Sequence, residues 1–299
     1  MILSVSRRTD IPAFYSTWFY QRVKEGFVIK RNPRNIHDIS RIPINKEVID
    51  CMVFWTKDPS KMISGLKNLG EIPFYFQYTL NAYPDEIEKD VPRRKNLLET
   101  FKKLSDKISP KRIVWRYDPI LLSDKISIDY HTKYFEYLAK RISGYSNTCI
   151  ISFLDKYKRI EKNLNSARIR ELTIDDIKIL SSRISPIAEK YSFNLFTCAE
   201  KYDLSNYGIR HGSCIDNKLI EEITDKKIFI KKDKYQRKDC GCIESADIGE
   251  YNSCHHNCVY CYANYNLKSS MQKTSEHDPF SAVQMGMISN SDIIKIKTF

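Results

Sequence analysis

The chain has 299 residues, of which 42% are hydrophobic and 29% are charged, and its formal net charge is +12. This length and composition are typical of one large globular domain or two small ones. No stretch approaches the run of about 18 apolar residues that a membrane span requires, and the N-terminus lacks the pattern of a secretion signal. Seven of the nine cysteines lie after residue 197, a clustering that indicates metal ligation or redox chemistry rather than a secreted disulfide framework. We therefore expect a cytoplasmic protein with no membrane partner.

The positive net charge favours an anionic partner, such as a nucleic acid, a nucleotide or another acidic small molecule. The lysines are scattered, however, with acidic residues between pairs such as Lys102–Lys103 and Lys226–Lys227, and no dense basic arm is present. A general bias toward Lys, Ile and Asn explains the same charge without any partner. Nucleic-acid binding therefore stays open beside a small anionic substrate.

Apolar runs and helical spacing predict alternating strands and helices in the first part of the chain. The predicted strands are 2–5, 49–55 and 74–80. The predicted helices are 14–25, which ends at Gly26, one that ends at Leu69, and 92–106. The polar segment 30–46 is predicted to be irregular.

The alternation continues through strands 112–116, 148–154 and 194–198 and helices 128–142 and 174–190. Thr173 and Asp176 are placed to form a capping box at the start of the last of these helices. The composition then changes to a cysteine-rich segment, 240–262, and a polar tail, 265–299. We predict a (β/α) barrel-like domain over 1–238. A cysteine-rich segment with a terminal strap, 239–299, is predicted to pack on this domain. Segment 240–262 is expected to fold back over it.

Six strands that alternate with helices predict an α/β fold with a parallel sheet and right-handed crossovers. The strands are apolar on both faces, as a sheet covered by helices requires. No glycine-rich phosphate turn follows the first strand. A partial or full (β/α) barrel of the TIM type therefore fits better than an open doubly wound sheet.

Barrel enzymes place their chemistry at the carboxyl ends of the strands, and in this sequence those ends are unusually polar. The candidate catalytic residues at these ends are Arg7, Arg8, Asp10, Lys57, Arg116, Asp118 and Glu200. Arginine at two of the ends suits a carboxylate or phosphate, which guanidinium binds through two parallel hydrogen bonds. Each residue also has a structural interpretation: Asp10 as a helix cap, Asp118–Pro119 as a turn, and Arg116 as an ion-pair partner of Asp118 or Glu200.

Near the C-terminus, Cys254, Cys258 and Cys261 follow the spacing C-x3-C-x2-C. Three thiols from one tight loop match a [4Fe–4S] cluster that keeps one iron open, whereas a structural zinc site takes four protein ligands. Tyr260, directly before the third cysteine, suits a residue that contacts the cofactor and shields the sulfurs from water.

This motif resembles that of the radical S-adenosylmethionine superfamily, in which three such cysteines hold the cluster. The resemblance implies that the open iron binds S-adenosylmethionine and that one electron, from a donor such as flavodoxin or ferredoxin, cleaves it to a 5′-deoxyadenosyl radical. Two features differ: the superfamily motif follows the first strand, and no glycine-rich stretch for the cofactor's amino group is evident.

Taken whole, the chain resembles the bacterial family called domain of unknown function 1848. The resemblance is carried by SVSRRTD at 4–10, FWTKDP at 54–59, WRYDP at 115–119, TCAE at 197–200 and CGC at 240–242, together with the cysteine loop. The family is uncharacterised, so it implies the cluster but no reaction.

Two other interpretations of the loop stay open. Either His255 or His256 can complete a Cys3His zinc site, as in a zinc-knuckle protein that binds nucleic acid through a basic surface. An iron–sulfur redox protein without S-adenosylmethionine chemistry is the third hypothesis.

The remaining cysteines divide into two groups. A second metal set, for an auxiliary [4Fe–4S] cluster or a four-thiolate zinc, is formed by Cys198, Cys214, Cys240 and Cys242. The alternative is that Cys198 is a small core residue and that Cys240 and Cys242 are a redox-active pair. Cys51 and Cys149 lie inside apolar strands and are interpreted as core residues.

Overall fold

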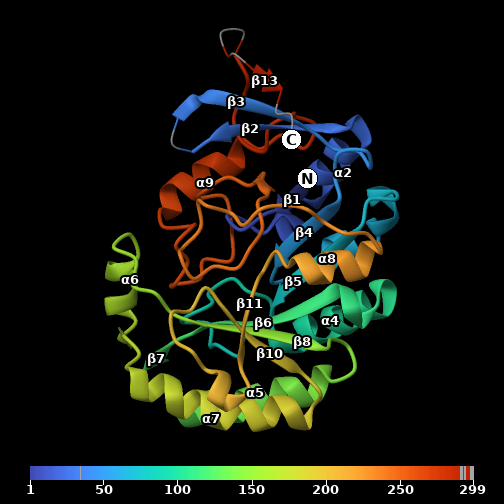
Figure 1. The fold of residues 1–299 in the computed structure, drawn as a ribbon. Coiled ribbons are helices and arrows are strands. Elements are labelled where there is room, and N and C mark those ends of the chain that lie inside the picture. The colour runs from blue at the N-terminus through green and yellow to red at the C-terminus, as the bar shows by residue number, and fades with distance from the viewer. Residues whose placement is uncertain (34, 290–291, 293, 297–299) are drawn as a thin grey trace.

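The computed structural model describes residues 1–33, 35–289, 292 and 294–296. Its centre is one sheet of eight strands, and every neighbouring pair in it is parallel. The strand order is β11 (Arg210–Gly212), β10 (Asn194–Cys198), β8 (Thr148–Phe153), β6 (Ile113–Ile120), β5 (Phe74–Thr79), β4 (Cys51–Thr56), β1 (Ile2–Val5) and β12 (Ala246–Asp247). The predicted α/β class with a parallel sheet is confirmed (Figure 1).

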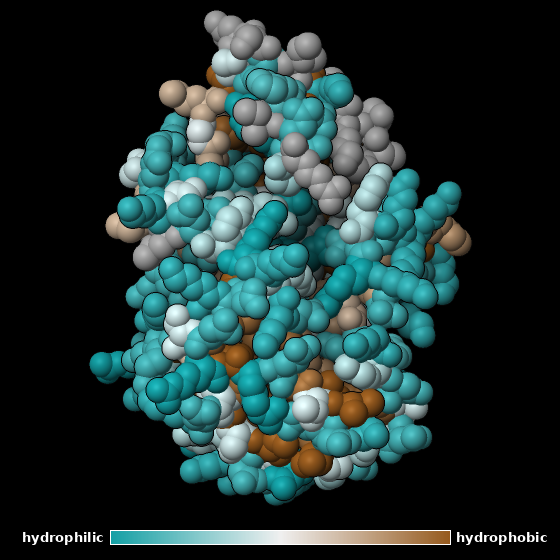
Figure 2. All heavy atoms as spheres, turned by 90° about the vertical axis from the view of Figure 1, so that its left-hand side faces the viewer, coloured by the Kyte–Doolittle hydropathy of each residue, from teal (hydrophilic) through white to brown (hydrophobic). Residues whose placement is uncertain are grey.

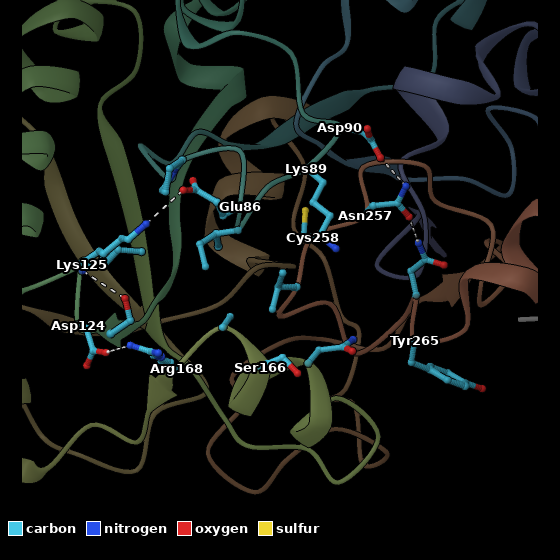
Figure 3. Close-up of a pocket in the computed structure, with 18 of the residues that line it drawn as sticks. Glu86, Lys89, Asp90, Asp124, Lys125, Ser166, Arg168, Asn257, Cys258 and Tyr265 are labelled. Atoms are coloured by element: carbon cyan, nitrogen blue, oxygen red, sulfur yellow. Dashed lines mark hydrogen bonds and ion pairs between the residues drawn. The ribbon is translucent and has the colours of Figure 1, made fainter.

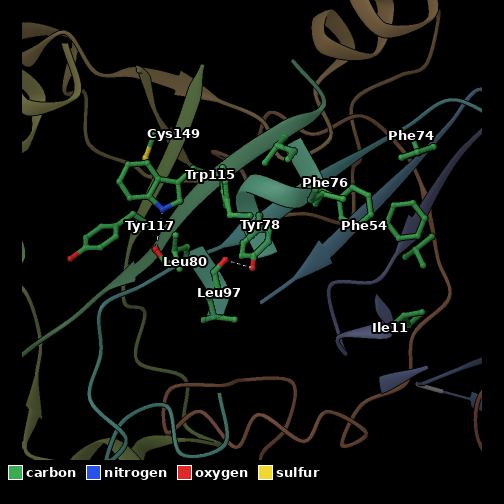
Figure 4. Packing of buried hydrophobic residues seen from close by; sticks show 14 of the residues in the cluster. Ile11, Phe54, Phe74, Phe76, Tyr78, Leu80, Leu97, Trp115, Tyr117 and Cys149 are labelled. Carbon is green, nitrogen blue, oxygen red and sulfur yellow. Dashed lines mark hydrogen bonds between the residues drawn. The ribbon is translucent and has the colours of Figure 1, made fainter. Parts of the chain in front are cut away.

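Both faces of this sheet are buried, as in parallel sheets generally. Successive side chains of a strand point to opposite faces. Phe76 and Tyr78 of β5 therefore join the large apolar cluster that also holds helix residues, while Tyr75 joins the cluster on the other face. Figure 4 shows the large cluster, in which the rings of Phe54 and Phe76 stack with centroids 4.8 Å apart. Such a ring pair contributes about 1 kcal/mol beyond its buried area.

The helices lie in the connections between the strands. They are α1 (Ile11–Phe14), α2 (Ser16–Glu25), α3 (Ser60–Ile63), α4 (Arg94–Ile108), α5 (Ile128–Ile142), α6 (Glu161–Ser166), α7 (Ile174–Lys190), α8 (Asn217–Thr224) and α9 (Leu267–Ser275). The predicted ranges of α5 and α7 are confirmed, as is the capping box formed by Thr173 and Asp176. None of the helices in the described ranges is long and apolar enough to cross a membrane.

Several predicted boundaries were wrong. The single helix over 14–25 is two helices, α1 and α2, and the Asp10 side chain caps α1 by accepting from the Ala13 N–H. The helix that ends at Leu69 is α3 followed by a separate 3-10 turn. Strand β6 runs on to Ile120, so Arg116 and Asp118 lie within it. The sequence did not predict this extension, because charged residues interrupt the apolar pattern by which a strand is recognised.

The prediction of an irregular segment over 30–46 was also wrong. Strands β2 (Phe27–Asn32) and β3 (Asn35–Pro43) form an antiparallel hairpin, and β13 (Ile294–Ile296) adds to β3. The hairpin buries Ile29 and Ile39 against Val283. Since Val283 is remote in sequence, local polarity gave no sign of this core. A smaller third sheet pairs β7 (Leu122–Ser123) with β9 (Ile169–Arg170).

The large sheet has two edges, β11 and β12, and within the described ranges no strand pairing joins them. The chain between β11 and β12 covers the face of the sheet that carries Tyr75. The Ile243 N–H donates to the Ile215 carbonyl at 3.3 Å, so segment 240–243 lies directly beside the residues that follow β11. At Gly241 a Cβ atom would stand 2.5 Å from Ser213 Oγ, so the two segments pass close to each other here. Strand β12 begins only three residues after Ile243.

Candidate functional site

The cysteine loop 254–261 lies over the carboxyl ends of β1, β4 and β5. His256 Nε2 is 2.8 Å from Asp10 Oδ2, just after β1. The Tyr260 hydroxyl donates to the carboxylate of Glu88, and residues 88 and 258 form an antiparallel bridge. The segment that we expected to fold back therefore contacts the strand ends that carry the predicted catalytic residues.

The three loop sulfurs lie close enough to affect one another electrostatically; Cys258 is buried, and Cys254 and Cys261 are partly buried. Burial raises the pKa of all three thiols. Backbone N–H groups oppose this rise at two of them: Cys254 accepts from His256 and Asp10, and Cys261 accepts from Ala263 and Asn264. N–H groups directed at sulfur stabilise a thiolate, and they tune the reduction potential when the sulfur ligates iron.

A buried ion pair accompanies the loop. Lys57 Nζ donates to Glu88 Oε1 at 2.7 Å, and Asn81 Nδ2 donates to the same oxygen at 3.1 Å. Burial lowers the pKa of Lys57, but Glu88 and the Cys258 thiolate raise it by more, so the amine stays charged. Burial likewise raises the pKa of Glu88, and Lys57 lowers it by more. A fixed positive charge thus lies beside Cys258.

The two histidines of the loop pack on α1. The rings of His255 and His256 lie 4.8 and 4.7 Å from the Phe14 ring, measured between centroids. Asp10 fixes His256 and also accepts from the Lys57 N–H at 2.7 Å, so this carboxylate joins the ends of β1 and β4 to the loop. His256 Nδ1 is buried and has no hydrogen-bond partner in the described part of the chain.

Arg116 and Asp118 form the ion pair that was one interpretation of the sequence. Arg116 Nε lies 3.0 Å from Asp118 Oδ2, and the Ser152 hydroxyl donates to the other carboxylate oxygen. Arg116 Nη1 also donates to Cys214 Sγ at 2.8 Å. Burial lowers the pKa of Arg116, but Asp118 and the thiolates of Cys214 and Cys198 raise it by more. Arg116 thus connects the predicted catalytic set to the second cysteine set.

Asp247 on β12 organises the end of β1, and the sequence analysis missed it. Its carboxylate accepts from the Ser4 and Ser6 hydroxyls at 2.7 and 2.6 Å and from the Arg7 N–H at 2.9 Å. Arg7 Nε lies 3.7 Å from the same carboxylate. Strand β12 has two residues, too few for a periodic pattern, so the sequence carried no signal for this partner.

Arg8 and Glu200 differ from the other predicted site residues. Arg8 Nη1 donates to the Gly249 carbonyl at 3.2 Å and lies over the Tyr251 ring, and among the described residues it forms no ion pair. Glu200 Oε1 accepts from the Phe153 N–H at 2.8 Å. Burial raises the pKa of Glu200 to about 7, with Asp155 adding to the rise. Glu200 is therefore a carboxyl group that exchanges its proton near neutral pH.

The second cysteine set is brought together as well. Cys198 Sγ and Cys214 Sγ lie 2.8 Å apart, Cys214 contacts Cys242, and Cys242 contacts Cys240. Cys51 and Cys149 are buried in the two faces of the sheet, as expected for core residues. In neither cysteine group, nor elsewhere in the described ranges, do three or more His, Cys, Asp or Glu side chains already stand as around a metal ion.

A cavity of about 1160 Å³ borders the outer side of the loop, between α6, β7 and the start of α9 (Figure 3). Its lining includes Lys89, Asp90, Lys125, Arg168, Asn257 and Cys258. The face of the molecule that carries α6 and α9 is mainly hydrophilic (Figure 2). The predicted catalytic residues do not line this cavity.

The model of the family named Domain of unknown function (DUF1848) matches residues 2–263. The chain belongs to this family. No curated protein matches it. Among solved structures, a protein provisionally assigned as an alpha-L-fucosidase from Bacteroides thetaiotaomicron is similar at 11% identity, over 76% of this chain and 82% of that one, with a TM-score of 0.28. Such a likeness carries no argument about activity.

Proposed function

We propose that this chain is a radical S-adenosylmethionine enzyme acting on an anionic small molecule. Cys254, Cys258 and Cys261 would hold a [4Fe–4S] cluster with one open iron. The observation that supports this most is the docking of three neighbouring thiols, one buried and two partly buried, over the strand ends, with backbone N–H groups directed at two of them.

The donor set fits a cluster better than a lone ion. Three thiols from one loop match the three cysteine-held corners of a cubane, and the charges of Cys254 and Cys261 both act on Cys258, so the three are neighbours. When bound, a reduced cluster of this kind supplies the electron that cleaves S-adenosylmethionine to a 5′-deoxyadenosyl radical. The protein's contribution is binding, orientation and exclusion of water.

Residues around the loop would perform those tasks. The Lys57 ammonium offsets negative charge at Cys258, and Glu88 fixes the position of Lys57. Tyr260 is held by Glu88, and its buried ring shields the neighbouring sulfurs from water. Asp10 accepts a hydrogen bond from the His256 side chain. It thereby also orients the backbone N–H of His256, which is directed at the Cys254 sulfur. We assign these groups to positioning.

The substrate would lie between the loop and the polar strand ends. Arg7 and Arg116 already have carboxylate partners, whereas Arg8 has carbonyl and aromatic contacts, which makes Arg8 the better anchor for an anionic group. Glu200, partly protonated near neutral pH, would donate a hydrogen bond or a proton. The cavity that borders Cys258 is somewhat larger than typical small-molecule sites and offers the cofactor an approach to the loop.

The same proposal includes a (β/α) barrel. Segment 240–243 lies beside the end of β11, and β12 follows it directly, so this segment would complete the ring between the two sheet edges. The strand ends would then converge on one mouth beneath the cysteine loop, as in barrel enzymes.

The test is S-adenosylmethionine cleavage by the anaerobically purified full chain after reduction with dithionite. We expect a paramagnetic cluster whose spectrum shifts when S-adenosylmethionine is added, and release of 5′-deoxyadenosine. A Cys258→Ala variant should lose both signals, while Cys149→Ala, which removes a buried thiol outside the loop, should keep them. A cluster that S-adenosylmethionine does not perturb would overturn the proposal in favour of a simple redox protein.

One observation favours a second candidate, a Cys3His zinc site in a nucleic-acid-binding protein. His256 donates Nε2–H to a carboxylate and leaves Nδ1 buried without a partner in the described part of the chain, an arrangement common for metal-ligating histidines. Zinc without iron in the anaerobic protein, lost in His256→Ala, together with RNA affinity that falls steeply with salt, would establish this alternative.

A further inference from the structure

Four buried cysteines outside the loop have no part in the proposed function. Cys198, Cys214, Cys240 and Cys242 are 8%, 5%, 4% and 1% exposed. They come from three places in the fold: the end of β10, the turn after β11, and the segment that leads to β12. Thiols from separate segments meet only where the fold brings them together.

The four sulfurs form a continuous chain of contacts. Cys198 contacts Cys214, Cys214 contacts Cys242, and Cys242 contacts Cys240. The backbone N–H of Ile215 is directed at Cys242 Sγ at 3.4 Å. An N–H group directed at sulfur is a contact that also suits a metal-bound thiolate.

Two arginines face these sulfurs. Arg116 Nη1 lies 2.8 Å from Cys214 Sγ, and the Arg7 guanidinium interacts electrostatically with Cys242 and Cys214. Four thiolates around one divalent cation carry a net charge of about −2, which the two guanidinium groups, each shared with an aspartate, partly offset. The surroundings therefore suit a cation held among the four sulfurs.

We propose that Cys198, Cys214, Cys240 and Cys242 form a four-thiolate site for a single zinc ion. Zinc–sulfur bonds of about 2.3 Å in a tetrahedron place the sulfurs about 3.8 Å apart. The 2.8 Å separation of Cys198 and Cys214 thus has to widen by about 1 Å, a change within reach of side-chain rotation. A cubane of four irons and four sulfides has to fit among its ligands and forces them much further apart.

The site has a structural consequence. Its ligands connect β10, the residues after β11 and segment 240–243, which lies beside the residues after β11 and leads to β12. A bound zinc would fasten this segment and so hold the strand ends in place. The inference does not depend on the loop cysteines or on S-adenosylmethionine.

The experiment uses the full chain with Cys254→Ala, Cys258→Ala and Cys261→Ala, which removes the loop site and its iron. We expect about one zinc per chain in this variant. After exchange with Co²⁺ we expect the intense visible bands of tetrahedral cobalt and strong near-ultraviolet thiolate-to-cobalt charge transfer. Absence of zinc, a four-iron cluster in this variant, or a disulfide between Cys198 and Cys214 would overturn the proposal.

Matched double variants in the same background locate the site. Cys240→Ala with Cys242→Ala should lower bound zinc at least tenfold, whereas Cys51→Ala with Cys149→Ala, which also removes two buried thiols, should leave it unchanged. Zinc retained by the first pair would contradict the assignment. If the first pair does not fold, the cobalt spectrum of the parent decides, because a charge-transfer intensity below that of four thiolates excludes the site.

Discussion

The two cysteine groups of this protein differ in how their sulfurs are held. In the loop, Cys254 and Cys261 accept backbone N–H groups, and no sulfur–sulfur hydrogen bond is found there among the described residues. In the second set, the sulfurs contact one another, with Cys198 and Cys214 2.8 Å apart. The two proposals above rest on this difference: a polynuclear cluster for the loop and a single ion for the second set.

Buried charge follows the same division. The loop has one cation, Lys57, which Glu88 partly neutralises. Arg7 and Arg116, each shared with an aspartate, lie beside the second set, and the charge of Cys198 also acts on Arg237. The second set thus has more arginine around it than the loop has lysine, although each of these ion pairs is close to neutral.

Removal of one loop thiol should have the largest effect. In Cys258→Ala we expect iron to fall at least tenfold and 5′-deoxyadenosine formation to cease, with zinc unchanged, because the two groups share no ligand. Anaerobic metal and sulfide analysis measures both metals in one sample. Loss of both iron and zinc in this variant would contradict two separate centres, since it would show that the two cysteine groups form a single coupled centre.

Replacement of Lys57 by Met tests the charge beside the loop. We expect a loss of about 3–5 kcal/mol in the free energy of unfolding, because Glu88 is left buried without its cation. The double variant Lys57→Met with Glu88→Gln should recover much of that loss. Urea unfolding of the full chain provides the measurement, and a loss below about 1 kcal/mol in the single variant would show that the pair is not buried as described.

Arg116→Gln tests the charge beside the second set. It removes the partner of Asp118 and the donor to Cys214, and we expect a loss of about 3 kcal/mol together with faster release of zinc to a chelator. Arg116→Lys should keep the charge and slow the release again. If zinc release were the same in all three proteins, Arg116 would have no role at the metal.

Glu200→Gln should produce the smallest change, and it depends on pH. Folding raises the pKa of this carboxyl from its ordinary value of 4.5 to about 7. Its contribution to stability is therefore complete below pH 4.5 and is lost as the pH rises through 7. Between pH 5 and 8 the parent should lose about 1–2 kcal/mol more than the variant. Equal pH profiles of the two melting temperatures would contradict the raised pKa.

Sequence patterns predicted the features that neighbouring residues form, and they missed the contacts between residues far apart in the chain. The loop ligands lie within eight residues, so their spacing alone identified them as a group. Long amphipathic helices such as α5 and α7 were equally clear. The partners Asp10 and His256, 246 positions apart, had no signal that linked them.

The same limit applies to the strands. The hairpin of β2 and β3 was missed because Val283 completes its core from the far end of the chain. Asp247 was missed because β12 is too short for a pattern, although it fixes the end of β1. The second cysteine set was grouped in the sequence by ligand count, and only the fold shows that its four sulfurs meet.

Metal and sulfide stoichiometry of the anaerobically purified, reconstituted full chain tests the central claim most directly. The account predicts about four irons, four sulfides and one zinc per chain. A colourless protein with zinc alone would contradict the cluster in the loop. Eight irons without zinc would contradict the single ion in the second set.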